Sequence, residues 1–172
     1  MADATTAIMV TLDPQHEGGY QNLHDDRANW SGGEIGVGAL IGTNGGITAL
    51  DMPGITADEM KNLTVAQKVA FYREKYWKPL YGEIVDQNVA SKLFDAGVLF
   101  GIGEAVSALQ RAVSTYVDGI FGVHTLLQMN EEEPTQLLVS FKAQLAHHAQ
   151  AIAAARPAEA QFLPVWLRRI AS

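Results

Sequence analysis

A short stretch near the N-terminus gathers side chains that could carry out acid–base chemistry. Glu17 stands directly before Gly18 and Gly19, and Asp26 follows nine residues after Glu17. Glycoside hydrolysis needs such a pair, because one carboxylic acid protonates the glycosidic oxygen while a second carboxylate activates water or stabilises an oxocarbenium-like transition state. Glu17 is our candidate acid, since partial burial beside Tyr20 would raise its pKa by desolvation. Asp26 is our candidate second carboxylate.

Other interpretations of the same segment compete with this one. Asp25 and Glu34 are rival second carboxylates, and Asp26 could instead hold its loop as an Asx turn. His16 and His24 lie near the acidic pair, but the fixed ligand spacing of a metal site is missing, so we expect no metal and no other cofactor. The chain has no cysteine, which excludes thiolate nucleophiles and disulfides.

Composition narrows the class of protein. The 172 residues are 48% hydrophobic, enough for one packed domain, and we expect a monomer. Twelve Lys and Arg against nineteen Asp and Glu give a net charge of −7, so nucleic acid is not an expected partner. No apolar run approaches the roughly 18 residues that cross a bilayer, so we expect no membrane insertion.

The distribution of glycine divides the chain into a glycine-rich part and a part with a helical pattern. Ten of the sixteen glycines fall between residues 18 and 54, a density that indicates turns, and residues 34–41 alternate apolar with small or polar residues as in a small β-hairpin or a long structured loop. After Gly54 the pattern is helical. Thr56 and Thr64 each precede a Glu or Gln by three residues, the spacing of a capping box. Asp95 lies in an apolar helix and needs a partner, for which we expect the glycine-rich loop.

Seven motifs in this order resemble glycoside hydrolase family 108, the muramidases of some phage endolysins and secretion-associated wall hydrolases. The first is Glu17-Gly18-Gly19-Tyr20 with Asn22 and Asp26. The others are Gly42-Thr43-Asn44-Gly45-Gly46-Ile47-Thr48, Ala70-Phe71-Tyr72-Arg73-Glu74-Lys75-Tyr76-Trp77, Leu93-Phe94-Asp95-Ala96, Leu109-Gln110-Arg111-Ala112-Val113, Asp118-Gly119-Ile120-Phe121-Gly122 with Thr125, and Phe162-Leu163 with Trp166-Leu167-Arg168-Arg169-Ile170.

The resemblance implies a mainly α (α+β) lysozyme-like fold with a glycine-rich loop or small hairpin near the N-terminus. It implies cleavage of the β-1,4 bond between N-acetylmuramic acid and N-acetylglucosamine, with Glu17 as general acid. Asp26 and Thr43 would complete the catalytic group. Substrate-binding residues would be Tyr20, Asn22 and Asn44. Trp30 is a further candidate, because its glycine-rich surroundings would expose it as a sugar-stacking platform, but a hydrophobic plug for its loop is the favoured alternative.

We therefore expect one domain, residues 1–172, with a catalytic part (1–100) and a helical peptidoglycan-binding segment (101–172). No signal peptide is readable, so the expected route is synthesis in the bacterial cytoplasm, then release or export to periplasmic or cell-wall peptidoglycan. The alternatives are a non-catalytic peptidoglycan-binding or assembly protein of the same fold, and a lytic transglycosylase.

Overall fold

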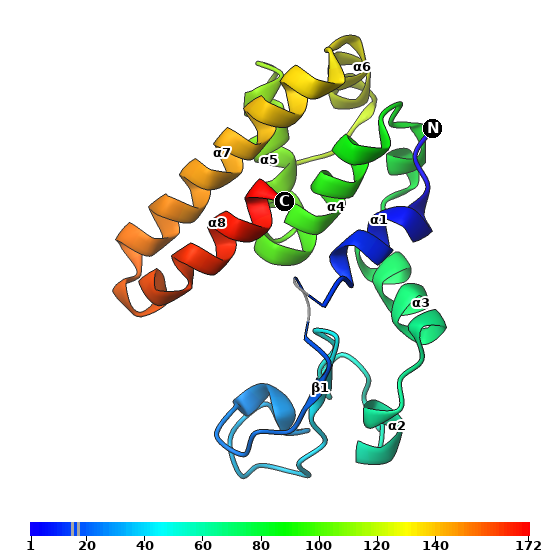
Figure 1. The fold of residues 1–172 in the computed structure, drawn as a ribbon, viewed down its shortest axis with the longest axis vertical. Helices are drawn as coiled ribbons and strands as arrows, with labels where there is room; N and C mark the ends of the chain where they lie inside the picture. Colours follow the sequence, from blue (N-terminus) through cyan, green and yellow to red (C-terminus); the bar gives the residue numbers. More distant parts are fainter. Residues whose placement is uncertain (15, 17) are drawn as a thin grey trace. The chain divides into compact units, whose positions relative to one another are not determined.

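The chain folds into two compact units in the computed structural model, which describes residues 1–14, 16 and 18–172. The helical unit combines Met1–Thr11 with Lys75–Ser172, and the hairpin unit is Leu12–Glu74 (Figure 1). The boundary expected at residue 100 falls inside the helical unit, between two helices that pack on each other. The functional division of the chain at that residue stays a prediction.

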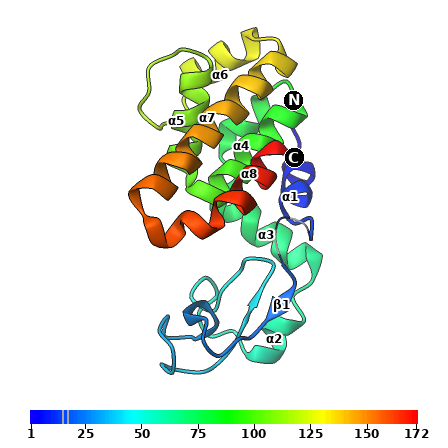
Figure 2. The same cartoon turned by 60° about the vertical axis from the view of Figure 1, so that its left-hand side comes forward.

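The mainly α fold predicted from the sequence is confirmed. The helical unit contains α1 (Ala4–Thr11), α4 (Gln87–Phe100), α5 (Ile102–Ala112), α6 (Val123–Glu131), α7 (Pro134–Ala155) and α8 (Leu163–Ala171), with 3-10 segments at Pro79–Glu83 (η2) and Pro157–Phe162 (η3). The chain reverses at η3, so that α7 and α8 lie side by side in both views of the ribbon (Figures 1 and 2).

Local sequence signals set the ends of these helices. Asp86 accepts a hydrogen bond from the backbone N–H of Val89 at 2.9 Å and so caps the start of α4. Gly101, at φ +92°, ends α4 and begins α5, a conformation that favours glycine. Glu133 accepts a hydrogen bond from the backbone N–H of Gln136 at 2.8 Å and caps α7 directly before Pro134, the first residue of the helix.

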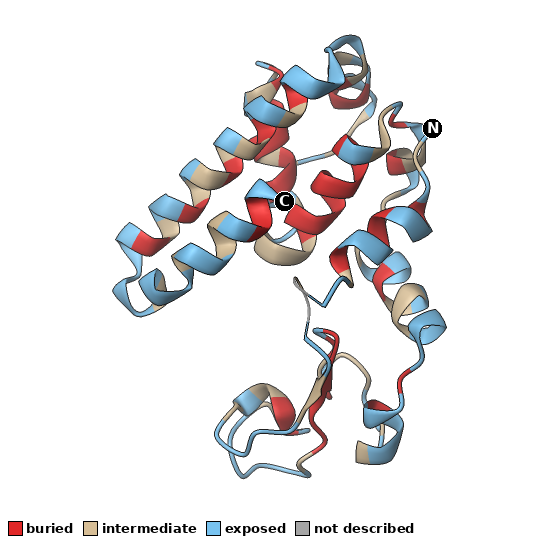
Figure 3. Ribbon diagram, in the orientation of Figure 1, coloured by how far each residue is buried: buried red, intermediate tan, exposed pale blue. Residues whose placement is uncertain are grey.

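Helix α4 is the centre of the helical unit. Its residues from Val89 to Gly97 are buried on every side, and Figure 3 shows most of the helix in red. Phe94 of α4 and Phe141 of α7 are among the largest fully buried side chains, and Leu109 of α5 is buried as well. Because this part of α4 is buried all round, its polar residues Ser91, Lys92 and Asp95 need partners within the protein.

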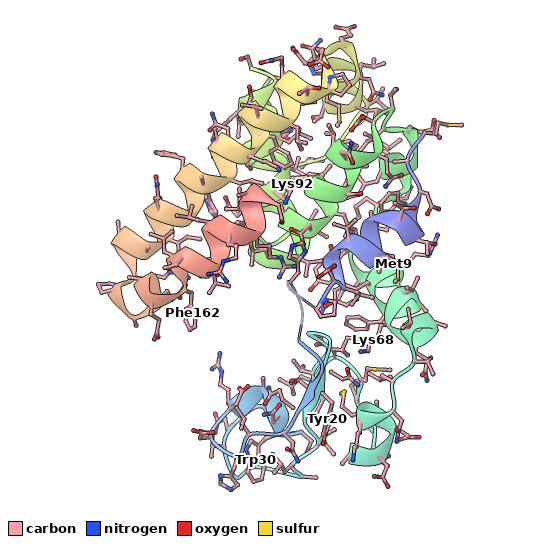
Figure 4. All side chains as sticks on the ribbon, viewed as in Figure 1. Met9, Tyr20, Trp30, Lys68, Lys92 and Phe162 are labelled. Carbon is pink, nitrogen blue, oxygen red and sulfur yellow. The ribbon has the colours of Figure 1, made fainter. Side chains whose placement is uncertain are left out.

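Asp95 is one of two buried charged residues on α4, together with Lys92, and the prediction that it braces the glycine-rich loop is wrong. Its Oδ1 accepts hydrogen bonds from Nε of Arg169 at 3.0 Å and from Oγ1 of Thr11 at 3.2 Å. Lys92 lies 3.8 Å from its Oδ2 and donates to the carbonyl oxygen of Arg169 at 2.9 Å (Figure 4). Asp95 is buried too deeply in the helical unit for water to solvate its charge, so it needs partners within the protein. The resulting ion cluster joins α1, α4 and α8.

The hairpin unit holds the strands. Strand β1 (Tyr20–Gln21) pairs antiparallel with β2 (Thr43–Asn44), and the 3-10 segment η1 (Arg27–Asn29) lies between them in sequence. Residues 31–39 form turns rather than strands, which is the long structured loop among the two predicted alternatives. Helix α2 (Ala57–Lys61) and helix α3 (Val65–Tyr76) follow.

Both predicted capping boxes are present in the hairpin unit. Thr56 and Glu59 exchange backbone and side-chain hydrogen bonds at the start of α2. Thr64 and Gln67 do the same at the start of α3. Within the described residues, none of the helices is both long enough and apolar enough to span a membrane.

Candidate active site

The hairpin brings two of the predicted catalytic residues to one side-chain amide. In the register of the strand pair, Gln21 of β1 stands opposite Thr43 of β2. The Nε2 group of Gln21 donates to Oγ1 of Thr43 at 2.8 Å and to Oδ2 of Asp26 at 3.0 Å. Asp26 and Thr43, seventeen residues apart in the sequence, are therefore joined through one group.

The orientation of the Gln21 amide follows from its other contacts. Its Oε1 accepts hydrogen bonds from the backbone N–H of Leu23 at 3.1 Å and from Nδ2 of Asn29 at 2.8 Å. Because a backbone N–H can only donate, the atom that faces Leu23 must be the oxygen, and Nε2 must face Asp26 and Thr43. Sequence analysis missed Gln21, since only the strand register identifies it as the partner of Thr43.

Asp26 has two structural bonds and remains half-buried. Its Oδ1 accepts from the backbone N–H of Ala28 at 3.0 Å and caps η1, and its Oδ2 accepts from Gln21. The Asx-turn interpretation and the network therefore coexist in one residue. The rivals Asp25 and Glu34 are exposed, and neither side chain has a hydrogen bond or ion pair among the described residues.

Thr43 offers a hydroxyl hydrogen at this point. The residue is 8% exposed, and its oxygen accepts from Gln21. Within the part of the chain that the structure describes, its own hydrogen has no acceptor, so it is available to donate to a water molecule or a saccharide oxygen.

Asn44 anchors the hairpin to the helices of its unit. Its Nδ2 donates to the carbonyl oxygens of Met60 at 2.8 Å and Lys61 at 3.2 Å, and its Oδ1 accepts from Nζ of Lys68 at 2.6 Å. Burial lowers the pKa of Lys68, whose position on α3 is labelled in Figure 4. The side chain of Asn44 is 4% exposed and fully bonded, so the structure favours anchoring over the predicted saccharide contact.

Trp30 is a plug for the glycine-rich loop. It is 9% exposed, its Nε1 donates to the carbonyl oxygen of His24 at 2.9 Å, and the His24 ring contacts it edge-on at 4.9 Å. Sugar stacking needs an exposed aromatic face, which a ring buried to this degree does not offer. Of the two predicted interpretations, the structure favours the plug over the substrate-binding platform.

Tyr20 and Asn22 differ in how far the fold holds them. The Tyr20 hydroxyl donates to the carbonyl oxygen of Ile41 at 3.3 Å. Its ring packs on Gly42, where φ is +90° and an added Cβ would lie 2.6 Å from Cε2 of Tyr20, so only glycine fits. Asn22 is exposed and has no side-chain partner among the described residues, so its amide is free to bind a ligand.

Two further features complete the hairpin unit. Glu17, the predicted acid, lies outside the described residues, as does Gln15. A cavity of about 620 Å³ lies between the 51–55 loop, α2 and α3, and contains none of the predicted site residues. The described residues include no group of three carboxylate or imidazole side chains placed to hold a metal ion.

Comparisons with known proteins found similarity to one family and to solved structures. The model of the Glycosyl hydrolase 108 family matches residues 12–101, a range that contains the hairpin unit and α4. Among solved structures, Brucella abortus SagA is similar, with a TM-score of 0.63 and 22% sequence identity over 97% of this chain and 94% of that one. No curated protein matches the sequence. Because the family model covers more than half of the chain, including every predicted site residue, this protein belongs to the Glycosyl hydrolase 108 family.

Proposed function

We propose that the protein is a peptidoglycan hydrolase that cleaves the β-1,4 bond between N-acetylmuramic acid and N-acetylglucosamine. Membership of a glycoside hydrolase family supports the reaction class. The observation that carries the proposal is the bridge from Gln21 to Asp26 and Thr43, because it gathers a carboxylate and a hydroxyl in the hairpin unit. Glu17 acts as the general acid and protonates the leaving oxygen.

Asp26 and Thr43 then stabilise the positive charge that develops in the transition state and position the attacking water. Both oxygens of Asp26 accept hydrogen bonds, an arrangement that suits an anion held in one orientation. The hydroxyl hydrogen of Thr43 orients water or a sugar oxygen beside it. Tyr20 supplies an apolar ring face to a sugar, and the free amide of Asn22 binds an N-acetyl group.

The biological setting is part of the proposal. The protein acts on periplasmic or cell-wall peptidoglycan after release or export, as a phage endolysin or a secretion-associated hydrolase. Glycan strands with their stem peptides are its macromolecular partner.

The test compares wild type, Glu17→Gln and Asp26→Asn on purified peptidoglycan. Soluble products are identified by mass spectrometry before and after borohydride reduction. We expect reducible muramic acid ends from wild type, loss of product release in Glu17→Gln by at least about 100-fold, and a smaller loss in Asp26→Asn. Undiminished release by Glu17→Gln would overturn the assignment of the acid.

Two other outcomes identify the alternatives. Anhydromuramic ends, which borohydride does not reduce, would show a lytic transglycosylase, which needs only the acid. Binding to peptidoglycan without any release of product by wild type would show a non-catalytic binding protein.

A further inference from the structure

The helical unit contains a second cavity that the proposed chemistry does not use. It has a volume of about 470 Å³ and opens between η2 and the loop that joins α5 to α6. Its walls are mostly apolar, formed by Pro79, Leu80, Ile102, Ile120 and Phe121. This volume falls within the roughly 300–1,000 Å³ of small-ligand pockets.

Lys78 gives the cavity a charge. Of the described residues that line it, Lys78 alone is ionisable. The residue is half-buried, and its ammonium group has no hydrogen bond or ion pair with any described residue. An unpaired ammonium at the edge of an apolar cavity is complemented by a carboxylate on a small apolar ligand.

The wall that carries Ile120 is held rigidly. The buried Gln110 accepts hydrogen bonds at Oε1 from the backbone N–H groups of Asp118 at 3.0 Å and Gly119 at 2.9 Å, and its Nε2 donates to the carbonyl oxygen of Ile120 at 3.1 Å. Gly119 has φ +72°, and an added Cβ would lie 3.1 Å from the carbonyl oxygen of Gly103.

The consequence is a preorganised wall with an exposed apolar side chain. Hydrogen bonds from Gln110 and from the Ile120 backbone lower the pKa of Asp118, which keeps this carboxylate charged as part of the loop. Ile120 is 68% exposed although its backbone is fixed. A ligand that covers Ile120 gains apolar contact without first having to order the loop.

A buried polar group lies next to the cavity. The Tyr81 ring contacts the lining residue Phe121 edge-on at 4.9 Å, and its hydroxyl has no partner among the described residues. Tyr81 is 1% exposed, and burial raises the pKa of its hydroxyl, so the group stays a neutral donor. Tyr81 does not itself line the cavity, so it supports the position of Phe121 rather than contacting a ligand.

We propose that this cavity binds the carboxyl-terminal D-alanyl-D-alanine of a peptidoglycan stem peptide. The carboxylate pairs with Lys78, and the two methyl groups contact Leu80 and Ile120. The choice of ligand rests on the proposed function, since stem peptides are part of that substrate. The cavity lies wholly in the helical unit, so it is a second recognition site in addition to the Asp26–Thr43 network.

The test titrates the full-length protein with N-acetyl-D-Ala-D-Ala and follows backbone amide shifts by NMR. The matched probes are the same dipeptide as its C-terminal carboxamide and N-acetyl-L-Ala-L-Ala. We expect saturable shifts at residues 78, 80, 81 and 118–121, since Pro79 has no backbone N–H. Binding of the carboxamide and of the L,L probe should be at least about fivefold weaker, the size expected for one lost charge pair or one misplaced methyl group.

Variants locate the interaction. Lys78→Gln is expected to bind the acid and the carboxamide equally, and Ile120→Ser to bind the acid about fivefold more weakly. The matched controls Lys61→Gln and Val123→Ser change exposed residues outside the cavity and keep wild-type binding. Circular dichroism checks that each variant is folded.

Several results would overturn the proposal. These are equal affinity for acid and carboxamide in the wild type, equal affinity for the D,D and L,L probes, shifts at other residues, or no saturable shift. Glycan cleavage is measured on the same preparation. Cleavage without dipeptide binding refutes this proposal alone, whereas dipeptide binding without cleavage refutes the hydrolase and leaves the site intact.

Discussion

The side-chain amide of Gln21 lies 3.0 Å from Oδ2 of Asp26 and donates a hydrogen bond to it. The same amide reaches Thr43, and its oxygen is fixed by the backbone N–H of Leu23. The carboxylate that supports catalysis in our account is thus oriented by a residue that has no charge of its own.

Replacement of Gln21 should therefore affect activity more than stability. Gln21→Ala frees Asp26 and Thr43 from each other, and we expect kcat/KM on peptidoglycan to fall by about tenfold or more, while the free energy of unfolding falls by only about 1–2 kcal/mol. Turbidity clearing and urea denaturation measure the two effects. Gln150→Ala on the exposed side of α7 is the matched control. Full activity in Gln21→Ala would show that the bridge has no catalytic role.

Replacement by alanine should reduce stability at Asn44 and weaken substrate binding at Asn22. Asn44→Ala leaves Lys68 and two backbone carbonyls without their partner, so we expect a loss of about 2–4 kcal/mol of stability. Asn22→Ala removes a free, exposed amide, so it should raise KM and leave Tm unchanged. Thermal unfolding and initial rates separate the two. A stable Asn44→Ala with raised KM would return Asn44 to the substrate-binding group.

The helical architecture could be predicted from the sequence because its signals are local. Capping boxes at Thr56 and Thr64, the acidic start of α7 and the glycine break at residue 101 each act within a few residues. The alternation in residues 34–41 was ambiguous because a strand also needs a partner. In this range only Leu40 forms a single bridge, with Trp30, and the paired strands are Tyr20–Gln21 and Thr43–Asn44.

The site was predicted less completely because its contacts are long-range. Asp26 and Thr43 follow from a motif, but their link through Gln21 depends on strand register. Asp95 needed a partner, and the sequence could not show that Arg169, 74 residues away, would supply it. The interpretation of Trp30 depended on burial, which glycine-rich surroundings did not predict.

The Asp95–Arg169 pair gives a further prediction. Nη2 of Arg169 lies 2.9 Å from Oδ1 of Asp95, and both side chains are buried. Removal of one partner leaves a buried charge, so Asp95→Asn and Arg169→Met should each cost about 3–5 kcal/mol of stability, and the double variant should cost less than the sum of the two. Urea denaturation of all four proteins forms the cycle. Additive losses would mean that the two side chains act independently.

Acidic pH should destabilise the N-terminal ends of helices α2 and α7. Hydrogen bonds from Thr56 lower the pKa of Glu59 below its ordinary value of 4.5, and those from the backbone of Gln136 and Thr135 do the same for Glu133. A lowered folded-state pKa means that the stabilisation is complete above the ordinary value and is lost as pH falls through the folded-state value.

The unfolding free energy should therefore decline below about pH 5. The fall of the unfolding free energy with decreasing pH should be shallower in Glu133→Gln. It should stay as in wild type in Glu133→Asp, which keeps a carboxylate at the cap. Denaturation curves recorded from neutral to acid pH measure the slopes. An unchanged acid slope in Glu133→Gln would show that the cap is not linked to proton binding.

Digestion of peptidoglycan in water enriched in heavy oxygen tests the central claim most directly. A muramidase adds solvent oxygen to C1 of N-acetylmuramic acid, so we predict the label at the muramic acid reducing end in wild type and no labelled product in Glu17→Gln. Label on N-acetylglucosamine ends, unlabelled anhydromuramic ends, or the same labelling in Glu17→Gln would contradict the account.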